Sequence, residues 1–220
     1  MARKKRQTGT NTRKKRCRLF VTFEGIDGCG KSTQMALAER FLKLQRFRVT
    51  CLREPGSTRV AEKIRNILLH ERFEMTDITE LLLYEAARAE LMQREILPAL
   101  KAGRIVLCDR FYDSTTAYQG YGRKLDMKTV SALHRVAVGA VKPDLTFVFD
   151  VDLRTAFARR GGRADRLESQ SRAFFNRVRK GFLEIARKES RRVKVIDASG
   201  SADSIFADVR QYLIRKLNRR

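Results

Sequence analysis

The residues best suited to carry chemistry lie in one short segment, residues 25–33, with the sequence Gly-Ile-Asp-Gly-Cys-Gly-Lys-Ser-Thr. Its first eight positions fit G-x-x-x-x-G-K-[ST]. Glycines let backbone N–H groups close around phosphate oxygens, Lys31 supplies positive charge, and the Ser32 hydroxyl can coordinate Mg²⁺. A glycine-rich turn without a ligand is disfavoured, because Lys31 and Ser32 stand in register. The pattern predicts binding of ATP or GTP phosphates by Gly25, Asp27, Gly28, Cys29, Gly30, Lys31, Ser32 and Thr33.

The elements that must position this loop follow from the hydrophobic pattern. Short apolar runs, typical of buried strands, alternate with amphipathic segments that repeat apolar residues at helical spacing. Such alternation predicts an α/β fold: a five-stranded parallel sheet with helices on both faces. Ligands of such sheets bind beyond the carboxyl ends of the strands, so the polar residues just after each strand are candidates for the site. The predicted strands span 19–23, 49–52, 104–108, 145–149 and 193–196, and the predicted helices 31–47, 58–69, 78–101, 128–140, a short one after Asp152, 169–188 and 201–217.

Composition limits the class of protein. The 220 residues suit one domain, and a hydrophobic content of 43% excludes wholesale disorder. No apolar run approaches the ~18 residues of a membrane span, so no membrane contact is predicted. The N-terminus lacks the apolar core of a secretory signal, and the four cysteines lack metal-site or redox spacing. We therefore expect a cytoplasmic protein without a structural zinc site.

The positive charge is unevenly distributed. The formal net charge is +23, and nine of the 48 Lys and Arg residues lie within residues 1–18, which contain no acidic residue. Residues 1–17 are predicted to be a disordered basic tail, ahead of one domain over 18–220. Residues 2–18 could contact a polyanion non-specifically and with strong salt dependence, but they lack the interleaved aromatic residues that stack on bases. Nucleic-acid binding is therefore a secondary alternative to catalysis.

Further motifs point to one group of phosphate-binding proteins. The Asn-Lys-x-Asp base-reading motif of GTPases is absent, and the chain is too short for a motor or transport ATPase. The chain resembles the thymidylate kinases, which belong to the P-loop nucleoside monophosphate kinases. Five ordered segments carry the resemblance: Phe-Glu-Gly-Ile-Asp-Gly-Cys-Gly-Lys-Ser-Thr at 23–33, Arg-Glu-Pro-Gly-Ser-Thr at 53–58, Ala-Ala-Arg at 86–88 after Tyr84, Asp-Arg at 109–110 with Ser114 and Ala-Tyr-Gln-Gly at 117–120, and Arg-Ala-Asp-Arg-Leu-Glu at 163–168.

This resemblance implies the reaction ATP + dTMP → ADP + dTDP with Mg²⁺, in a homodimer of the nucleoside monophosphate kinase fold. It places Asp27 near the 3′-hydroxyl of the sugar and Glu54 near the transferred phosphoryl group and its metal. Arg65 and Arg110 correspond to arginines around the monophosphate. For the nucleoside, it implies that Tyr84 stacks on thymine, Arg88 donates to the base, Thr115 and Gln119 contact the base, and Tyr118 packs under the sugar. The full expected substrate set is Asp27, Glu54, Pro55, Arg65, Tyr84, Arg88, Arg110, Ser114, Thr115, Tyr118 and Gln119.

The family supplies its transition-state arginine either from the phosphate loop or from a mobile lid. Gly28 and Cys29 stand where the first type has arginine, whereas the segment 159–168 is rich in arginine. The resemblance thus implies the lid type, in which closure brings an arginine onto the phosphoryl group and excludes water. The expected metal ligands are Ser32 and Glu54. The expected catalytic residues are Lys31, Glu54, Arg110, Arg160 and Arg163.

Two positions depart from the family pattern. Tyr84 replaces the usual Phe, which preserves the stacking face, and Glu85 occupies a position that is commonly small or aromatic, so we expect it to face solvent. His70 and His134 are expected to be ordinary helix residues. The alternatives to a dTMP kinase are another nucleoside monophosphate kinase, a deoxynucleoside kinase, or a P-loop protein that binds nucleic acid through its tail.

Overall fold

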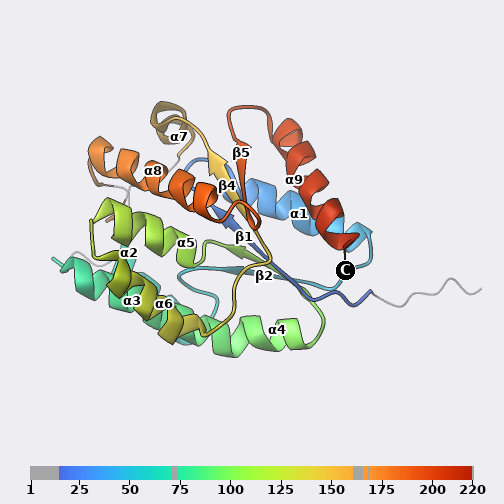
Figure 1. Ribbon diagram of the computed structural model, residues 1–220, viewed down its shortest axis with the longest axis horizontal. Helices are drawn as coiled ribbons and strands as arrows, with labels where there is room; N and C mark the ends of the chain where they lie inside the picture. The colour runs from blue at the N-terminus through green and yellow to red at the C-terminus, as the bar shows by residue number, and fades with distance from the viewer. Residues whose placement is uncertain (1–14, 71–73, 161–165, 168, 220) are drawn as a thin grey trace, which may run out of the picture.

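The computed structural model describes residues 15–70, 74–160, 166–167 and 169–219 (Figure 1). Its sheet has five parallel strands in the order β2-β3-β1-β4-β5, which confirms the predicted sheet. Each strand is a short apolar run, and all six residues of β1 are buried. Because β1 is central, the phosphate loop emerges in the middle of the carboxyl edge, with β3 and then β2 beside it. The strands are β1 (Leu19–Glu24), β2 (Val49–Arg53), β3 (Ile105–Asp109), β4 (Leu145–Asp150) and β5 (Val193–Asp197).

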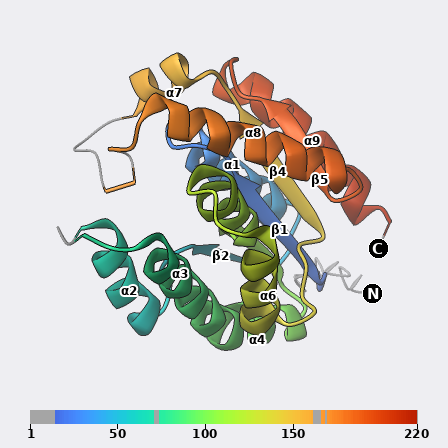
Figure 2. The same cartoon turned by 60° about the vertical axis from the view of Figure 1, so that its left-hand side comes forward.

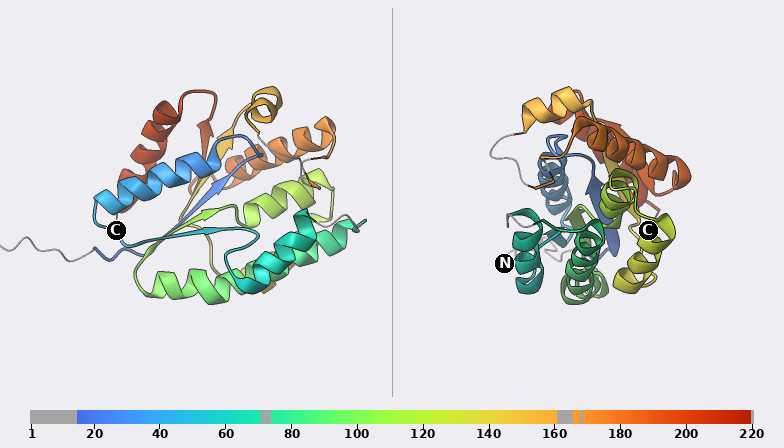
Figure 3. Two further views of the ribbon diagram at one scale, coloured as in Figure 1. Left: turned by 180° about the vertical axis from the view of Figure 1, so that it is seen from behind. Right: turned by 90° about the vertical axis from the view of Figure 1, so that its left-hand side faces the viewer.

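Helices cover both faces of the sheet. Helices α1 and α9 pack on each other on one face, and α8 packs against β4, β5 and the segment 112–122 on the other (Figures 1 and 3). A third group, in which α3 lies between α2 and α6, extends this second layer (Figure 2). Most of the helices begin after a polar residue whose side chain caps the first turn. At the start of α2, for example, Thr58 Oγ1 accepts a hydrogen bond from the backbone N–H of Ala61. The bounds are α1 (Lys31–Leu44), α2 (Arg59–Leu69), α3 (Asp77–Leu91), α4 (Leu97–Lys101), α6 (Met127–Val138), α7 (Leu153–Arg159), α8 (Arg172–Lys188) and α9 (Ala202–Leu217).

Two helical segments differ from the prediction. The helix expected over 78–101 is divided by the π-helical segment η1 (Met92–Ile96), just before Pro98, which lacks an N–H to donate. A helix that the periodicity did not predict spans α5 (Tyr112–Thr115) and the π-helical η2 (Thr116–Gly122). Its sequence is poor in helix formers, but nearly all of its residues are buried against α8 and α6. Tertiary packing therefore stabilises this helix.

The described chain begins with contacts to the domain. The backbone N–H of Lys15 donates to the carbonyl of Arg46, and that of Cys17 donates to Gly103. Residues 15–17 thus lie against the turns that follow α1 and α4. The rest of the predicted tail, residues 1–14, lies outside the described residues.

Candidate active site

The phosphate loop connects β1 to α1 in a conformation that requires glycine. Gly25, Gly28 and Gly30 all have positive φ values, of 136°, 84° and 93°. At Gly28 the restriction is also steric, since a Cβ atom there would lie 2.0 Å from the carbonyl oxygen of Ala156 in α7. The loop therefore packs directly on the helix that leads into the predicted lid.

The polar side chains of the loop are held by nearby groups. Lys31 Nζ donates to the carbonyl of Ile26 at 2.9 Å and lies 3.5 Å from Asp27 Oδ1. Ser32 Oγ donates to Asp109 Oδ2 at 2.7 Å, which joins the start of α1 to the end of β3. Burial would raise the pKa of Asp27, but the positive charges of Arg110 and Lys31 hold that pKa well below its ordinary value. The loop thus presents a carboxylate, an ammonium and a hydroxyl side by side.

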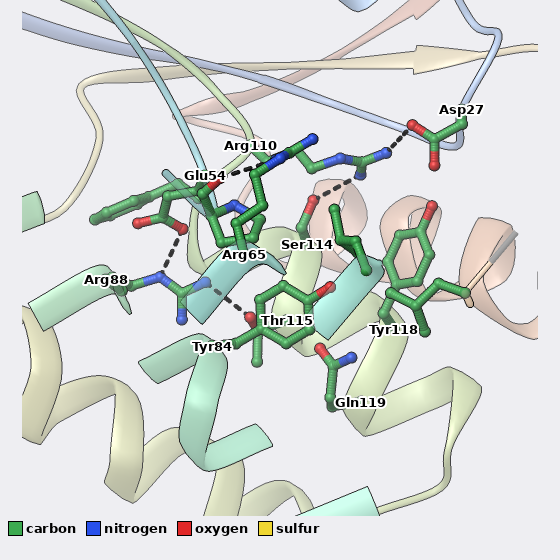
Figure 4. A pocket seen from close by; sticks show the side chains of 14 residues that line it. Asp27, Glu54, Arg65, Tyr84, Arg88, Arg110, Ser114, Thr115, Tyr118 and Gln119 are labelled. Atoms are coloured by element: carbon green, nitrogen blue, oxygen red, sulfur yellow. Dashed lines mark hydrogen bonds and ion pairs between the residues drawn. The ribbon is translucent and has the colours of Figure 1, made fainter. Parts of the chain in front are cut away.

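Two hollows meet at the carboxyl edge of the sheet. The outer one follows the loop and is lined by Asp27, Gly28, Gly30, Lys31, Ser32, Thr33, Arg53, Glu54, Arg65, Asp109, Arg110 and Arg159. The inner one, drawn in Figure 4, lies between α2, α3 and the α5–η2 helix and is lined by Asp27, Glu54, Pro55, Arg65, Leu69, Tyr84, Arg88, Arg110, Phe111, Ser114, Thr115, Tyr118, Gln119 and Leu167. Four residues line both: Asp27, Glu54, Arg65 and Arg110. A group bound in the outer hollow can therefore meet a group bound in the inner one.

Arg110 connects the loop to the inner hollow. Its terminal nitrogens donate to the carbonyl of Gly25 at 2.9 Å, to Ser114 Oγ at 3.1 Å and to Asp27 Oδ1 at 2.5 Å. Burial opposes its charge, but Asp27 keeps the pKa of Arg110 well above its ordinary value. Its guanidinium carbon also lies 5.3 Å from the ring centre of Tyr118. The side chain is thus fixed at the junction of the two hollows as a permanent cation.

Arg88, which is only 1% exposed, is fixed at the other end of the inner hollow. Its Nε donates to Glu54 Oε2 at 2.9 Å, one terminal nitrogen donates to Glu85 Oε1 at 2.5 Å, and the other donates to Thr115 Oγ1 at 2.8 Å. Burial raises the pKa of Glu54 to about 7 despite the nearby charge of Arg88. The expectation that Glu85 faces solvent is wrong: Glu85 is 5% exposed and also contacts His134 Nδ1 at 2.7 Å. The spacing of three residues along α3 turns Glu85 and Arg88 toward the same side.

The remaining nucleoside-side residues gather as Figure 4 shows. Tyr84, Thr115 and Gln119 lie at one end of the inner hollow, and Asp27 and Arg110 lie at the other. Tyr118 lines the hollow, but it also belongs to the core, where its ring meets the edges of Phe174 and Phe182. Pro55 is buried, follows Glu54 through a cis peptide bond, and its carbonyl accepts from Arg65 at 2.8 Å. The structure therefore brings all the predicted substrate-side residues to one cavity.

The predicted lid is described in part. Arg159 lines the outer hollow, and its guanidinium donates to the carbonyls of Ala198 and Ser199. The guanidinium of Arg160 lies over the ring of Phe157, 4.8 Å from its centre, and Arg160 is not among the residues that line either hollow. Arg166 donates to the carbonyl of Leu68 and pairs with Glu80 at 2.6 Å. Arg163 lies outside the described residues.

Comparison with known proteins decides the family. The thymidylate kinase family model matches residues 23–209. The chain is 45% identical over 193 residues to a thymidylate kinase of Kosmotoga olearia (87% of this chain, 93% of that protein) and 46% identical over 204 residues to one of Symbiobacterium thermophilum (92% and 95%). The crystal structure of thymidylate kinase from Ehrlichia chaffeensis matches with a TM-score of 0.76 at 36% identity, covering 90% of this chain and 98% of that one. The chain belongs to the thymidylate kinase family. The predictions of the family, the fold and the phosphorylation of dTMP to dTDP with ATP are confirmed.

Sequence reasoning assigned no role to several polar residues around this site, although Glu24 and Asp109 stand in the quoted motif segments. Glu24, at the end of β1, is fully buried; its Oε2 accepts from Ser114 Oγ at 2.6 Å, and burial together with Asp113 raises its pKa well above the ordinary value. Asp109 holds the hydroxyl of Ser32. Both end a buried strand beside the loop, which was an available signal. Glu80, which contacts Gln119, stands four and eight residues before Tyr84 and Arg88, so helical spacing could have identified it.

Proposed function

We propose that this thymidylate kinase binds ATP in the outer hollow and dTMP in the inner one, and that the phosphoryl group passes between them beside Asp27, Glu54, Arg65 and Arg110. The single observation that carries this assignment is that these four side chains line both hollows. Phosphoryl transfer needs positioning and neutralisation of charge more than covalent catalysis. Arg65 and Arg110, which lie where the two hollows meet, can supply both positioning and neutralisation of charge.

The loop residues support the donor side. The backbone N–H groups of the loop and of the start of α1 favour phosphate oxygens, and Lys31 adds a compact positive charge next to them. Arg110 and Arg65 offer N–H groups to the acceptor phosphate from the other side. Asp27 is held ionised between Lys31 and Arg110, so it can accept a hydrogen bond from a sugar hydroxyl.

A magnesium ion fits the polar groups at the start of α1. The Ser32 hydroxyl and the Asp109 carboxylate are joined at 2.7 Å, and oxygen ligands of this kind suit Mg²⁺. Glu54 follows the neighbouring strand, and its buried Oε1 has no hydrogen-bond partner among the described residues. We propose that Ser32 and Asp109 hold the ion, with Glu54 binding it directly or through water. When bound, Mg²⁺ would neutralise charge on the phosphates of ATP.

The inner hollow suits a pyrimidine nucleotide. We propose that Tyr84 stacks on the base, that Arg88 and Gln119 hydrogen-bond to its edge with Thr115 beside them, and that Tyr118 packs under the sugar. Pro55 and Ser114 complete the wall. Arg88 can serve as a donor because three of its five N–H groups are held by protein acceptors, which leaves two for a ligand.

An acceptor panel tests the assignment. ADP release is measured with ATP·Mg²⁺ and each of dTMP, dUMP, dCMP, dGMP and thymidine. The highest kcat/KM is expected for dTMP, because only dTMP combines a phosphate for Arg110 with the base edge and methyl group of thymine. Preference for another monophosphate would make the protein a different nucleotide kinase, and preference for thymidine would make it a nucleoside kinase.

The raised pKa of Glu54 predicts a pH dependence. Its carboxylate form is the one that pairs with Arg88 and can bind the metal, and burial raises its pKa to about 7. As pH falls through that value the carboxylate is protonated, so kcat/KM for dTMP should drop about tenfold per pH unit below it. The measurement is kcat/KM from pH 5.5 to 9 at constant ionic strength, with the phosphate ionisation of free dTMP, near 6, determined separately. A flat profile down to pH 6.5 would contradict this assignment.

Homodimerisation is proposed from the outer surface of the three-helix group. Helices α2, α3 and α6 lie side by side (Figure 2). Each of them exposes apolar side chains. The exposed residues are Val60, Ile67, Ile78, Leu82, Met127 and Val136. A Leu82→Glu, Val136→Glu variant is expected to convert a dimer to a monomer in light scattering after size exclusion, whereas Leu183→Glu on α8 should leave the mass unchanged. A wild-type monomer would contradict the proposal.

Two broader proposals concern the cell. No helix among the described residues is long and apolar enough to cross a bilayer. We propose a cytoplasmic location because all four cysteines are free, which is typical of a reducing compartment. We also propose that basic residues 2–18 make non-specific contacts with polyanions. Deletion of residues 2–14, which removes six Lys and Arg residues, should weaken salt-dependent retention on heparin and leave kcat and both KM values unchanged.

A further inference from the structure

Two carboxylates lie behind the nucleoside end of the inner hollow without lining it. Glu80 is 0% exposed and Glu85 is 5% exposed, and both stand on α3. Each contacts a side chain that does line the hollow: Glu80 contacts Gln119, and Glu85 contacts Arg88. Such residues would act on a ligand only through these neighbours.

Glu80 determines which end of the Gln119 amide faces the hollow. Its Oε1 accepts from Gln119 Nε2 at 2.8 Å, both of its oxygens accept from Arg123, and Arg166 forms an ion pair with its Oε2 at 2.6 Å. Burial would raise the pKa of Glu80, but the hydrogen bonds from Arg123 and Gln119 and the charges of both arginines hold that pKa below its ordinary value. An ionised carboxylate can only accept, so the amide nitrogen must face it. The amide oxygen is then left as an acceptor on the side of Tyr84 and Thr115 (Figure 4).

Glu85 fixes the orientation of Arg88, the other polar side chain in contact with a carboxylate of α3. Its Oε1 accepts from Arg88 at 2.5 Å and from His134 Nδ1 at 2.7 Å, and His134 Nε2 is 2.9 Å from Thr116 Oγ1. Together with Glu54 and Thr115, this contact holds the guanidinium plane of Arg88 on three sides. Because a guanidinium has no acceptor, Arg88 presents only donors to the hollow.

We propose that Glu80 and Glu85 are positioning residues that set the hydrogen-bonding pattern read from the base, with Gln119 fixed as acceptor and Arg88 fixed as donor. The inference rests on the proposed binding of dTMP in this hollow. Thymine and uracil present an N3–H donor next to an O4 acceptor, which matches this pattern. Cytosine presents an N3 acceptor next to a 4-amino donor, which opposes it at both positions. A site built this way rejects the mismatched base strongly, since buried polar groups would be left unpaired.

The test is the ratio of kcat/KM for dTMP to that for dCMP. In Glu80→Gln, residue 80 can donate as well as accept, so Gln119 is free to turn its amide. The ratio should fall by about tenfold or more, the value of one hydrogen bond, and the KM for ATP should not change. Glu85→Gln should lower the same ratio and raise the KM for dTMP, because the amide oxygen can still accept from Arg88 but the charge that strengthens this contact is lost. Glu184→Gln, which removes an ion pair with Arg187 on the outer side of α8, is the matched control and should change neither value.

A second ratio separates positioning from a merely structural role. dTMP and dUMP share the same hydrogen-bonding edge, so their kcat/KM ratio should stay within about twofold of the wild-type value in both variants. If all three acceptors lose activity in parallel, the dTMP:dCMP ratio does not move and the positioning role is refuted. Preference of the wild-type protein for an acceptor other than dTMP would instead refute the proposed function.

A double-mutant cycle identifies the residue through which Glu80 acts. In a Gln119→Leu background there is no amide to orient, so Glu80→Gln should have no further effect on the dTMP:dCMP ratio. An additive effect would overturn the assignment for Glu80. If Glu80→Gln does not fold, as judged by thermal unfolding, the Glu85→Gln variant and its ratio still test the proposal independently, because Glu85 acts through Arg88 and not through Gln119.

Discussion

Replacing Arg110 with alanine is expected to lower kcat/KM for dTMP by about three orders of magnitude. Arg110 lies where the two hollows meet, and it contacts the loop through Gly25 and Asp27 and the α5–η2 helix through Ser114. Preorganised donors at a position of developing charge contribute about 10²–10³ each, and Arg110 also keeps Asp27 in place. Initial rates over both substrates should show a lower kcat together with a higher KM for dTMP.

Arg110→Lys separates charge from geometry. Lysine keeps the positive charge but cannot reach Gly25, Ser114 and Asp27 together through a planar fork, so a loss of about 10- to 100-fold is expected, smaller than that of the alanine variant. Arg187→Ala, at a well-exposed position on α8, serves as the control and should behave as wild type. Thermal unfolding verifies that each variant is folded. If Arg110→Ala retains more than about a tenth of kcat/KM, the junction is not the point of transfer.

The strands and most helices could be predicted because their signals are local. Each strand is a short run of mainly apolar and β-branched residues, and α1, α2 and α8 repeat apolar residues at helical spacing. The helix over 112–122 could not be predicted, because its residues have weak helix propensity and its π-helical part departs from the 3.6-residue period. It exists because it is buried between α8, α6 and α3. This helix carries Ser114, Thr115, Tyr118 and Gln119, so the resemblance to a family placed residues that periodicity alone did not.

In the candidate site, too, some residues could be predicted from local sequence signals and others could not. The residues that follow strands, such as Glu54 and Arg110, could be predicted because parallel strands bring their carboxyl ends to one edge. Their partners could not, because a partner depends on which side chains the fold buries together. Glu85 is an example: as an isolated carboxylate on a helix it suggests a solvent-facing side chain, but its neighbours Arg88 and His134 compensate its charge in the interior.

The second large effect is expected on kcat when one arginine of the predicted lid is replaced with alanine. The phosphate loop carries Gly28 and Cys29 in place of arginine, so a cation for the transition state has to come from elsewhere. Arg159→Ala, Arg160→Ala and Arg163→Ala are made singly, and one of them is expected to lower kcat by about a thousandfold, as for arginines that act on a transferred phosphoryl group. The KM values should change little, since such an arginine acts in the transition state.

Arg159 belongs in this series of alanine variants together with Arg160 and Arg163, the two arginines that the resemblance to the family favours. The reason is the position of its side chain. Arg159 lines the outer hollow, where we propose that ATP binds, and its guanidinium contacts two main-chain carbonyls that follow β5. Arg160 packs on Phe157 and would have to leave that ring to reach the phosphoryl group. Arg154→Ala, at an exposed position on α7, is the matched control. If no variant costs more than about tenfold in kcat, or about 1.4 kcal/mol, the lid does not supply the catalytic arginine, and the arginine charge must come from Arg65 and Arg110 beside Lys31.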